Sequence, residues 1–478
     1  MASFYPHKPN VLLILSDDHG PWAMGCAGNS EIITPSLDRL AREGTRFENF
    51  FCVSPVCSPA RASLMTGEIP SQHGVHDWIR DGNIGTNRID YLEGKTLITD
   101  LATEAGYRCG LIGKWHLGSS DLPRKGFVKW FAHQSGMSSY EESPMVDETN
   151  LINCEGYLTE VLTEEALQFI ARETEQSQPF WLNLNYTAPH YPWIDSHPSR
   201  YTDLYSNCNF ESCPIENIHP WNAGGNPATD EGHSNRRESL IGYYAATTAM
   251  DMGIGHVIDL LEKLNLAKST LVIFMSDNGM NCGHHGIWGK GNGTRPQNMY
   301  DTSVKVPCIF SQPGRISKNR LIPQLTSAYD FFPTIASYLN FPSIEKNNKP
   351  GQSFKELLLG ASELDRSPIF VFDEYGPVRM VRTLHWKYIY RDPDGPHELY
   401  HLEEDPDEKI NLIDNNSADQ VKSYLHAELV SWFNLYVTPH LDGRKWGVTG
   451  AGQISKPQAG MEIENAFASI PIAALSKK

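Results

Sequence analysis

Hydrophobic and polar positions follow one another along the first two-thirds of the chain in a pattern typical of alternating strands and helices. Short, continuous apolar runs predict buried strands at residues 10–16, 107–114, 180–186, 271–276 and 306–311. Between these runs, apolar residues at helical spacing predict helices at residues 35–43, 96–104, 157–175 and 239–264. This alternation predicts an α/β fold with a large, mostly parallel sheet that is sandwiched by helices.

The pattern changes at a polar stretch, residues 342–350, which is typical of a linker. Beyond it the sequence predicts short strands and then one amphipathic helix, at residues 369–372, 380–383, 387–390, 398–401 and 418–436. We therefore expect two domains, an α/β domain at residues 1–345 and a smaller α+β domain on a short antiparallel sheet at residues 346–478. The tail from about residue 443 shows no periodicity, and its docking on a neighbouring copy would produce an oligomer.

Composition and charge exclude several classes of protein. The 478-residue chain is 40% hydrophobic and 20% charged, which excludes a largely disordered or fibrous protein. Its net charge of −17 disfavours binding to nucleic acid or to an anionic membrane surface, and an anionic substrate would need a local cluster of positive charge. The sequence shows neither a transmembrane run nor a signal peptide. We expect a cytoplasmic protein, or a periplasmic or secreted one if a signal has been removed.

The nine cysteines do not form the pairs that bind zinc or catalyse thiol exchange. No CxxC spacing occurs, which excludes zinc-ribbon and thioredoxin-like sites. Cys208 and Cys213 would be able to form a disulfide in an oxidising compartment. Reduced thiols in the core or in loops are the simpler interpretation.

Polar side chains end several of the predicted strands, where ligands bind in open α/β sheets. Asp17 and Asp18 follow the first strand, and Asp277 and Asn278 follow the strand at residues 271–276. Three carboxylates and an amide oxygen suit a hard divalent cation such as calcium or magnesium. Either pair taken alone also fits an ordinary turn. Two further strand ends carry basic side chains, Lys114, His116 and His190.

A cysteine near a predicted helix start is the candidate nucleophile. Ser58 suits a helix cap and Pro59 suits the first turn, so Cys57 is expected just outside the helix N-terminus. Such a position attracts anions, and Arg61 adds a permanently charged donor in the same turn. On these residues alone, Cys57 is either a thiolate nucleophile with a lowered pKa or a structural cysteine.

Taken together, these segments resemble the formylglycine-dependent type I sulfatases of the alkaline phosphatase superfamily. The resemblance rests first on Cys-x-Pro-x-Arg at residues 57–61, which Ala-Ser-Leu-Met-Thr-Gly follows. Other segments match the family's motifs in the family's order, namely residues 15–18, 113–118, 188–190, 276–279, Lys290, 399–400, 405–406 and 411–412. The likeness extends from about residue 8 to residue 412. It implies the alkaline phosphatase-like fold, a sulfuric ester hydrolase and, we expect, a sulfated carbohydrate as substrate.

The resemblance also implies a modified nucleophile and a metal ion. A separate maturation enzyme would oxidise Cys57 to formylglycine, an aldehyde whose hydrate carries two hydroxyl groups. One calcium ion would be held by that hydrate together with Asp17, Asp18, Asp277 and Asn278. The cation would lower the pKa of the attacking hydroxyl and neutralise the oxygens of the sulfate ester.

The remaining motif residues receive roles from the same resemblance. Arg61 would orient the hydrate, and Lys114 and Lys290 would bind sulfate oxygens. His190 would protonate the departing alcohol. His116 would then take a proton from residue 57, which expels inorganic sulfate from the covalent sulfate ester and regenerates the aldehyde.

Side chains close to these motifs are candidates for binding the rest of the substrate. Aromatic groups beside polar ones suit a sugar ring, and the best candidates are His285, Trp193, His76 and Arg80. Each of them alone also fits packing or surface exposure. A small sulfate ester such as an aryl sulfate or choline sulfate also fits, although no aromatic cage for a quaternary ammonium group is evident.

Two alternatives to a carbohydrate sulfatase stay open at this point. The first keeps the fold and the nucleophile but hydrolyses phosphonate monoesters or phosphodiesters. The second is a glycan-binding relative without catalytic activity, in which Cys57 is never converted to formylglycine.

Overall fold

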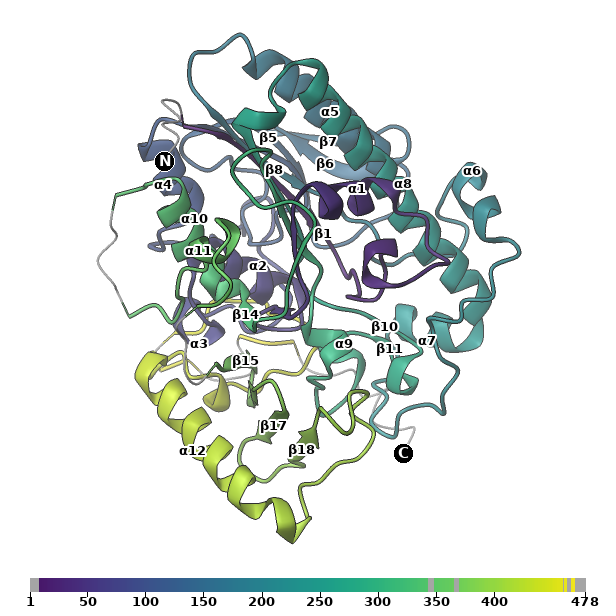
Figure 1. Ribbon diagram of the computed structural model, residues 1–478, viewed down its shortest axis with the longest axis vertical. Coiled ribbons are helices and arrows are strands. Elements are labelled where there is room, and N and C mark those ends of the chain that lie inside the picture. The colour runs from purple at the N-terminus through teal and green to yellow at the C-terminus, as the bar shows by residue number, and fades with distance from the viewer. Residues whose placement is uncertain (1–7, 343–347, 365–368, 459, 462–465, 469–478) are drawn as a thin grey trace.

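A ten-stranded sheet forms the centre of the computed structural model, and a four-stranded sheet lies beside it (Figure 1). The structure describes residues 8–342, 348–364, 369–458, 460–461 and 466–468. In spatial order the large sheet contains β13 (Arg320–Ile322), β2 (Thr45–Phe47), β12 (Cys308–Ser311), β9 (Thr270–Ser276), β1 (Asn10–Ser16), β8 (Phe180–Asn185), β4 (Arg108–Gly113), β5 (Phe127–His133), β6 (Ser143–Asp147) and β7 (Asn150–Cys154). The five strands from β9 to β5 in this order are parallel, whereas β12, β6 and β7 pair antiparallel with their neighbours.

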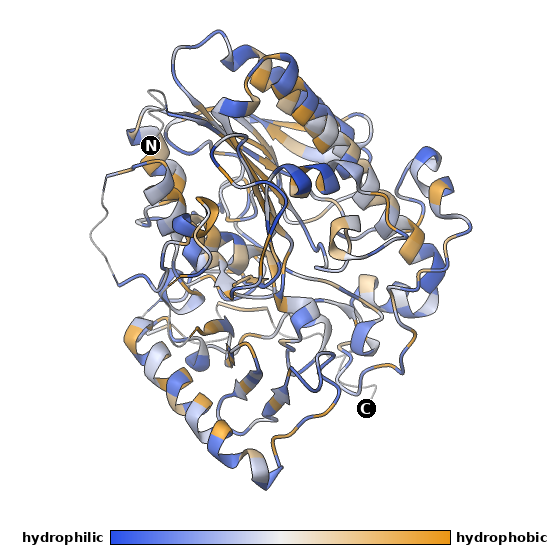
Figure 2. Ribbon diagram, in the orientation of Figure 1, coloured by the Kyte–Doolittle hydropathy of each residue, from blue (hydrophilic) through white to orange (hydrophobic). Residues whose placement is uncertain are grey.

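The central strands are apolar at every position because both of their faces are buried. In β1, Val11, Leu13 and Leu15 pack into the core on one side of the sheet. Leu12 and Ile14, which point the other way, pack into the core on the opposite side. A continuous apolar run is the pattern expected for a strand of this kind. Figure 2 shows the same apolar concentration along the centre of the sheet.

Helices cover both faces of the sheet (Figure 1). One face carries α1 (Pro35–Glu43), α5 (Leu158–Glu173) and α8 (Arg236–Lys263), and the other carries α2 (Cys57–Thr66), α4 (Ile98–Glu104) and α10 (Phe331–Tyr338). The short helices are α3 (Pro70–His73), α6 (Ser199–Thr202), α7 (Pro227–Ser234), α9 (Asp301–Val304) and α11 (Lys355–Leu358). Two further two-stranded sheets pair β3 (Phe50–Phe51) with β14 (Thr326–Ser327) in parallel, and β10 (Asn281–Cys282) with β11 (Trp288–Gly289) antiparallel. The predicted sandwich is therefore confirmed.

The small sheet is antiparallel, as the sequence predicts. Its strands lie in the order β15 (Val371–Tyr375), β16 (Val378–Arg382), β17 (Trp386–Arg391) and β18 (Glu398–His401), and α12 (Asp419–Tyr436) packs against β16 and β17. The predicted elements agree with the observed ones to within three residues at each end. The expected domain boundary at residue 345 lies in 343–347, outside the described residues.

Buried polar contacts join the small sheet to the large domain. Glu374 in β15 accepts hydrogen bonds from the backbone and the hydroxyl of Ser71, at 3.1 and 2.7 Å. Arg379 in β16 pairs with Glu374 and with Asp442, at 2.9 Å each. Because these buried charges are paired, separating the two sheets would expose or orphan them. The described part of the tail packs against its own chain, where Gln453 bridges to Ile79.

The described residues include every cysteine of the chain. All nine cysteines are free, including Cys208 and Cys213. Among the helices of the described segments, none combines the length and the apolar character needed to cross a bilayer.

A glycine at the end of β4 provides a test of the fold close to the polar strand ends. Gly113 has a φ of 108°, and a Cβ at this position would overlap the backbone carbonyl of Asn185 in β8. Gly106 has a φ of 87° but faces open space. Each alanine variant carries backbone strain of roughly 1 kcal/mol, but only Gly113→Ala adds a backbone clash. We expect Gly113→Ala to melt clearly below Gly106→Ala in a thermal unfolding scan, and equal melting temperatures would contradict this packing.

Candidate active site

The predicted site residues meet at the carboxyl ends of the parallel strands. Asp17 follows β1, Asp277 follows β9, Lys114 follows β4 and His190 lies beyond β8. The helix α2 brings Cys57 to the same place, with its Sγ 3.3 Å from Asp17 Oδ1. All of these side chains are buried apart from His190, which keeps a 13% exposed side chain. The structure therefore gathers residues that are up to 272 positions apart, as Asp18 and Lys290 are, into one cluster.

The start of α2 differs slightly from the expectation. Cys57 is the first residue of the helix, and Val56 rather than Ser58 occupies the capping position. The Ser58 hydroxyl accepts a hydrogen bond from the backbone N–H of Ile79, at 2.9 Å, so it is engaged by another segment. All ten residues of α2 are buried. The helix is thus held by its surroundings instead of by a side-chain cap.

The prediction of a low-pKa thiolate at Cys57 is wrong. Burial and the nearby Asp17 carboxylate raise the pKa of Cys57 to about 12, although Lys114 and Lys290 act in the opposite direction. Lys290 Nζ donates to Cys57 Sγ at 2.7 Å. Neither this contact nor the helix N-terminus compensates for the loss of water around the sulfur. The thiol is therefore protonated at neutral pH.

Three cationic side chains neutralise the three carboxylates of the cluster. The ion pairs join Lys114 to Asp17, Lys290 to Asp18 and Arg61 to Asp277. Burial alone would raise the pKa of Asp17, but Lys114, His190 and Arg61 outweigh it and hold that pKa well below its usual range. Burial and the charge of Asp17 raise the pKa of Asp277 to about 6. Paired charges of this kind are tolerated in the interior, whereas a single unpaired one is costly.

Four side chains of the cluster are close enough together to hold a metal ion. Asp17, Asp18, Cys57 and His190 each offer a ligand atom, and these atoms lie within 4.8 Å of one another. Asn278 Oδ1 is buried and has no hydrogen-bond partner in the described part of the structure. An orphaned amide oxygen beside two carboxylates is what a bound cation would satisfy. The cluster is thus a possible metal site that shares Asp17, Asp18 and Cys57 with the predicted ligand set, with His190 in place of Asp277.

His116 has one ring nitrogen bound and the other free. Its Nε2 lies 2.8 Å from the carbonyl oxygen of Ile79. Since a carbonyl can only accept, Nε2 carries the proton and Nδ1 keeps its lone pair. Burial, reinforced by Lys114, lowers the pKa of His116 well below the usual value. The buried Nδ1 has no protein partner within the described residues, so its lone pair is not engaged by the protein.

His190 is the outermost member of the cluster. Its Nδ1 donates to the carbonyl of Tyr191 at 2.6 Å, and its Nε2 lies 3.6 Å from Asp18 Oδ2. Burial lowers the pKa of His190, while Asp18 and Asp17 oppose that effect. Tyr140 donates its hydroxyl to the backbone carbonyl of His190 at 2.8 Å. The Nε2 edge is thereby held next to a carboxylate that stabilises its protonated form.

The expected sugar-binding side chains are divided between core and surface. His76 is completely buried and faces the ring of Phe467, and Trp193 is 1% exposed and packs against neighbouring aromatic rings. These two side chains are therefore packed in the interior of the described structure, and their role in binding the substrate stays a prediction. Arg80 is exposed. His285 is partly exposed and stacks on Tyr300, with ring centroids 3.8 Å apart.

Sequence reasoning missed partners that hold the motif residues in place. The carbonyl of Ile79 leaves no trace in the sequence, because every residue type supplies one. Tyr243 in α8 donates its hydroxyl to the backbone carbonyl of Asp18 and accepts from the N–H of Gly20, both at 2.9 Å. A hydroxyl on the buried face of an apolar helix was the available signal for this second contact.

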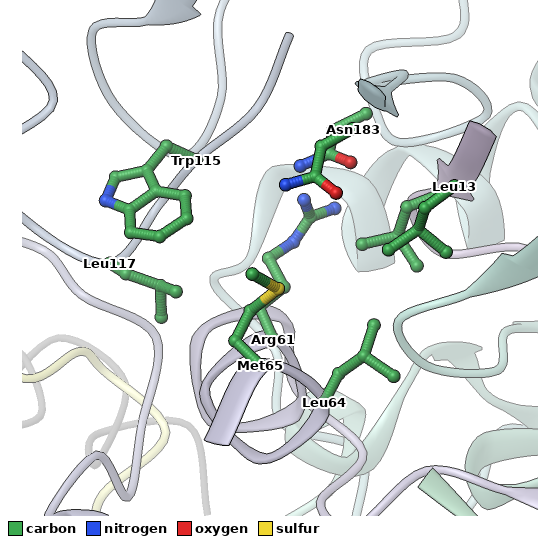
Figure 3. A pocket seen from close by; sticks show the side chains of 9 residues that line it. Leu13, Arg61, Leu64, Met65, Trp115, Leu117 and Asn183 are labelled. Carbon is green, nitrogen blue, oxygen red and sulfur yellow. The ribbon is translucent and has the colours of Figure 1, made fainter. Parts of the chain in front are cut away.

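A small cavity borders Arg61 together with Leu15 and Asn185 near the carboxyl ends of β1 and β8. Its volume is about 10 Å³, room for about one water molecule. Figure 3 shows the Arg61 guanidinium reaching up beside Asn183, with leucine, methionine and tryptophan side chains around it. Asn185 Oδ1, in the same wall, has no hydrogen-bond partner in the described protein.

Comparisons with known proteins place this geometry in a family. The model of the sulfatase family matches residues 9–341, and the model described as the C-terminal part of N-sulphoglucosamine sulphohydrolase matches residues 283–434. The chain is 30% identical to an ulvan-active sulfatase of Formosa agariphila over 447 residues, which cover 89% of this chain and 81% of the relative.

Two solved structures share the fold. One, a complex with D-glucosamine-2-N,6-O-disulfate as its substrate, superposes with a TM-score of 0.76 at 22% identity, over 92% of this chain and all of the other. The other, a phosphonate monoester hydrolase of Agrobacterium radiobacter, gives a TM-score of 0.68 at 20% identity, over 90% and 97% of the two chains. With the family model matching most of its length and the motif residues gathered at one edge of the sheet, this chain belongs to the sulfatase family of sulfuric ester hydrolases.

Proposed function

We propose that this enzyme removes sulfate from a sulfated carbohydrate, using a formylglycine made from Cys57 and one calcium ion. The observation that carries the proposal is the position of Cys57, whose sulfur contacts Lys290 and Asp17 inside a cluster of six paired charges. The sugar is supported by the ulvan-active relative and by the structural neighbour with a glucosamine disulfate.

The state of Cys57 argues for its modification. A thiol with a pKa of about 12 is a poor nucleophile at neutral pH. Conversion of this side chain to formylglycine, by a separate maturation enzyme, would place hydroxyl groups of the aldehyde hydrate where the sulfur now lies. Those hydroxyls would be next to Asp17 and Lys290 without any rearrangement of α2.

The charge balance argues for the cation. Three carboxylates and three cationic side chains cancel, so the protein groups alone give little attraction for an anion. A calcium ion held by Asp17, Asp18, Asp277 and Asn278 would leave an excess of two positive charges in a protein whose net charge is −17. When bound, the ion lowers the pKa of the attacking hydroxyl and neutralises sulfate oxygens.

The protein side chains would bind the sulfate and transfer the protons. Lys114, which pairs with Asp17, and Lys290, which contacts Cys57 Sγ, would bind the sulfate oxygens, while Arg61 would orient residue 57. His190, the exposed member, is placed to protonate the leaving alcohol on the outer side. His116, with a free Nδ1 on the buried side, is placed to take a proton from residue 57.

Hydrolysis of a phosphonate monoester is the second candidate activity, because a phosphonate monoester hydrolase has the same fold. The same cations would bind any tetrahedral oxyanion. Turnover of the nitrophenyl sulfate and of a phosphonate ester of the same nitrophenol separates the two. Faster turnover of the sulfate supports the proposed function, and faster turnover of the phosphonate favours the second candidate.

The nucleophile assignment predicts the behaviour of a cysteine variant. Cys57→Ala should retain less than about a hundredth of the aryl-sulfate turnover, because covalent catalysis is lost, while its melting temperature changes little. Cys26→Ala, which alters a cysteine in the 3-10 helix Gly25–Ala27, is the matched control and should stay active. Intact-mass measurement should show the wild-type chain lighter than its unmodified sequence. Full activity of a wild-type sample with unmodified Cys57 would contradict the formylglycine proposal.

The metal assignment predicts a coupled loss of calcium and stability. Asn278→Ala should reduce calcium binding and abolish the fall in melting temperature that chelation causes in the wild type, because the ligand set is broken. Asn281→Ala is the control, since Asn281 is equally buried but donates to Gly289 and Ser303. This control should still show the chelation effect. Unchanged activity and melting temperature of the wild type after exhaustive chelation would rule out the calcium site.

The assignment of His190 predicts a dependence on the leaving group. His190→Ala should slow hydrolysis of a sugar sulfate by about 10²–10⁴, the range typical of general acid catalysis, because a sugar hydroxyl leaves poorly without a proton. A nitrophenyl sulfate should suffer much less, since nitrophenolate leaves unaided. His116→Ala should slow both substrates to a similar extent. Equal damage to both substrates in His190→Ala would indicate that His190 mainly positions the sulfate.

A further inference from the structure

The C-terminal tail contacts the loop at residues 74–80, and this loop contacts His116, the base of the proposed reaction. We propose that Gln453 is a positioning residue, which fixes the proton arrangement of His116 by holding the loop at residues 74–80. This inference rests on the proposed role of His116 as the base. The tail lies beyond the ranges 9–341 and 283–434 that the family models match, so the family match assigns it no role.

The Gln453 side chain is completely buried and uses both ends of its amide on the chain around it. Its Oε1 accepts hydrogen bonds from the backbone N–H groups of His76 and Asp77, at 2.8 and 3.3 Å. Its Nε2 donates to the carbonyls of Gly74 and Ser455, at 2.9 and 3.0 Å. An amide saturated in this way specifies one arrangement of the loop, because any other arrangement leaves buried polar groups unpaired.

The backbone of Gln453 also forms hydrogen bonds with the loop. Its N–H donates to the carbonyl of Trp78 at 2.7 Å, and its carbonyl accepts from the N–H of Arg80 at 2.9 Å. These two bonds flank Ile79 and form a parallel bridge to it. Trp78 adds a hydrogen bond from its indole N–H to the carbonyl of Gly450, at 3.1 Å. The tail therefore holds the loop on both sides of Ile79.

Ile79 connects the tail to the residues of the proposed reaction. Its carbonyl accepts from His116 Nε2 at 2.8 Å, and its N–H donates to the Ser58 hydroxyl at 2.9 Å. One peptide segment thus contacts both the base and the residue that follows Cys57 in α2. A shift of this segment would move the acceptor on which the protonation pattern of His116 depends.

The surroundings of His116 leave the Ile79 carbonyl as the element that sets its protonation pattern. The face of the ring packs on Gly136, where a Cβ would overlap the imidazole. Its Nδ1 has no protein partner among the described residues that would select a tautomer. With Ile79 in place, the proton stays on Nε2 and Nδ1 remains the accepting atom. Without it, the neutral ring is free to carry its proton on Nδ1, which removes the base.

The experiment compares Gln453→Met with a control variant in the same tail. Gln453→Met keeps the side-chain volume but loses the amide bonds to the loop. Thr449→Val is the control, because the Thr449 hydroxyl contacts only the tail itself, at Ala468 and Ala451. We expect Gln453→Met to lower kcat by a factor of about 10–100 with little change in KM, equally for a sugar sulfate and a nitrophenyl sulfate. Thr449→Val should keep the wild-type kcat.

A double-mutant cycle with His116→Ala distinguishes positioning from general damage. If Gln453 acts through His116, then adding Gln453→Met to His116→Ala should cost little more than His116→Ala alone. If the reductions in kcat of the two single variants multiply in the double variant, the inference is overturned. An unimpaired His116→Ala would instead overturn the proposed function of His116, so the two failures are distinguishable. If Gln453→Met does not fold, Trp78→Phe, which removes only the bond to Gly450, takes its place in the same cycle.

A spectroscopic measurement tests the tautomer directly. Nitrogen NMR of histidine-labelled protein should show the Nε2–H form for the ring signals that disappear in His116→Ala. These signals should shift toward the Nδ1–H form in Gln453→Met and stay unchanged in Thr449→Val. An unaltered tautomer in Gln453→Met would overturn the inference, whatever the effect on kcat.

Discussion

The burial of paired charges at the carboxyl ends of the parallel strands is the constraint on which the rest of this structure depends. Three carboxylates and three cationic side chains lose most of their water there, and each is stable only because its partner is held in place. The holding comes from elements that are themselves buried, above all β1, β9 and α2. The charge cluster therefore depends on the continuous apolar sheet and on the fully buried helix, just as the hydrophobic core does.

The same burial decides which chemistry the side chains can perform. It keeps the Cys57 thiol protonated and the ring of His116 neutral, with a pKa well below the usual value. A strong nucleophile must then come from a changed side chain or from a cation, not from the unmodified sulfur. The burial that keeps His116 neutral leaves its Nδ1 lone pair without a protein partner among the described residues, although the lowered pKa also makes the ring a weaker base. Desolvation thus disfavours the simple thiolate mechanism.

The sequence predicts this fold well where burial leaves a strong pattern and poorly elsewhere. The central strand at residues 10–16 and the helix at 35–43 are found to the residue, because apolar runs and helical periodicity record their burial. Strands β5 to β7 leave no clear run, since β7 is largely exposed at the sheet edge. In the site, the spacing of the motifs identifies the charged residues. It does not reveal that Trp193 turns inward, since an aromatic residue beside a motif fits either a pocket or a core.

Contacts made by backbone atoms are the part of the site that sequence reasoning cannot reach. The carbonyl of Ile79 orients His116, and the tail that fixes Ile79 lies more than 370 residues further along the chain. The arrangement also places the two histidines on different levels. His190 keeps a 13% exposed side chain, whereas His116 is buried. The proposed acid and the proposed base therefore differ in burial, and the tail contacts the loop that carries the hydrogen-bond partner of the buried one, Ile79.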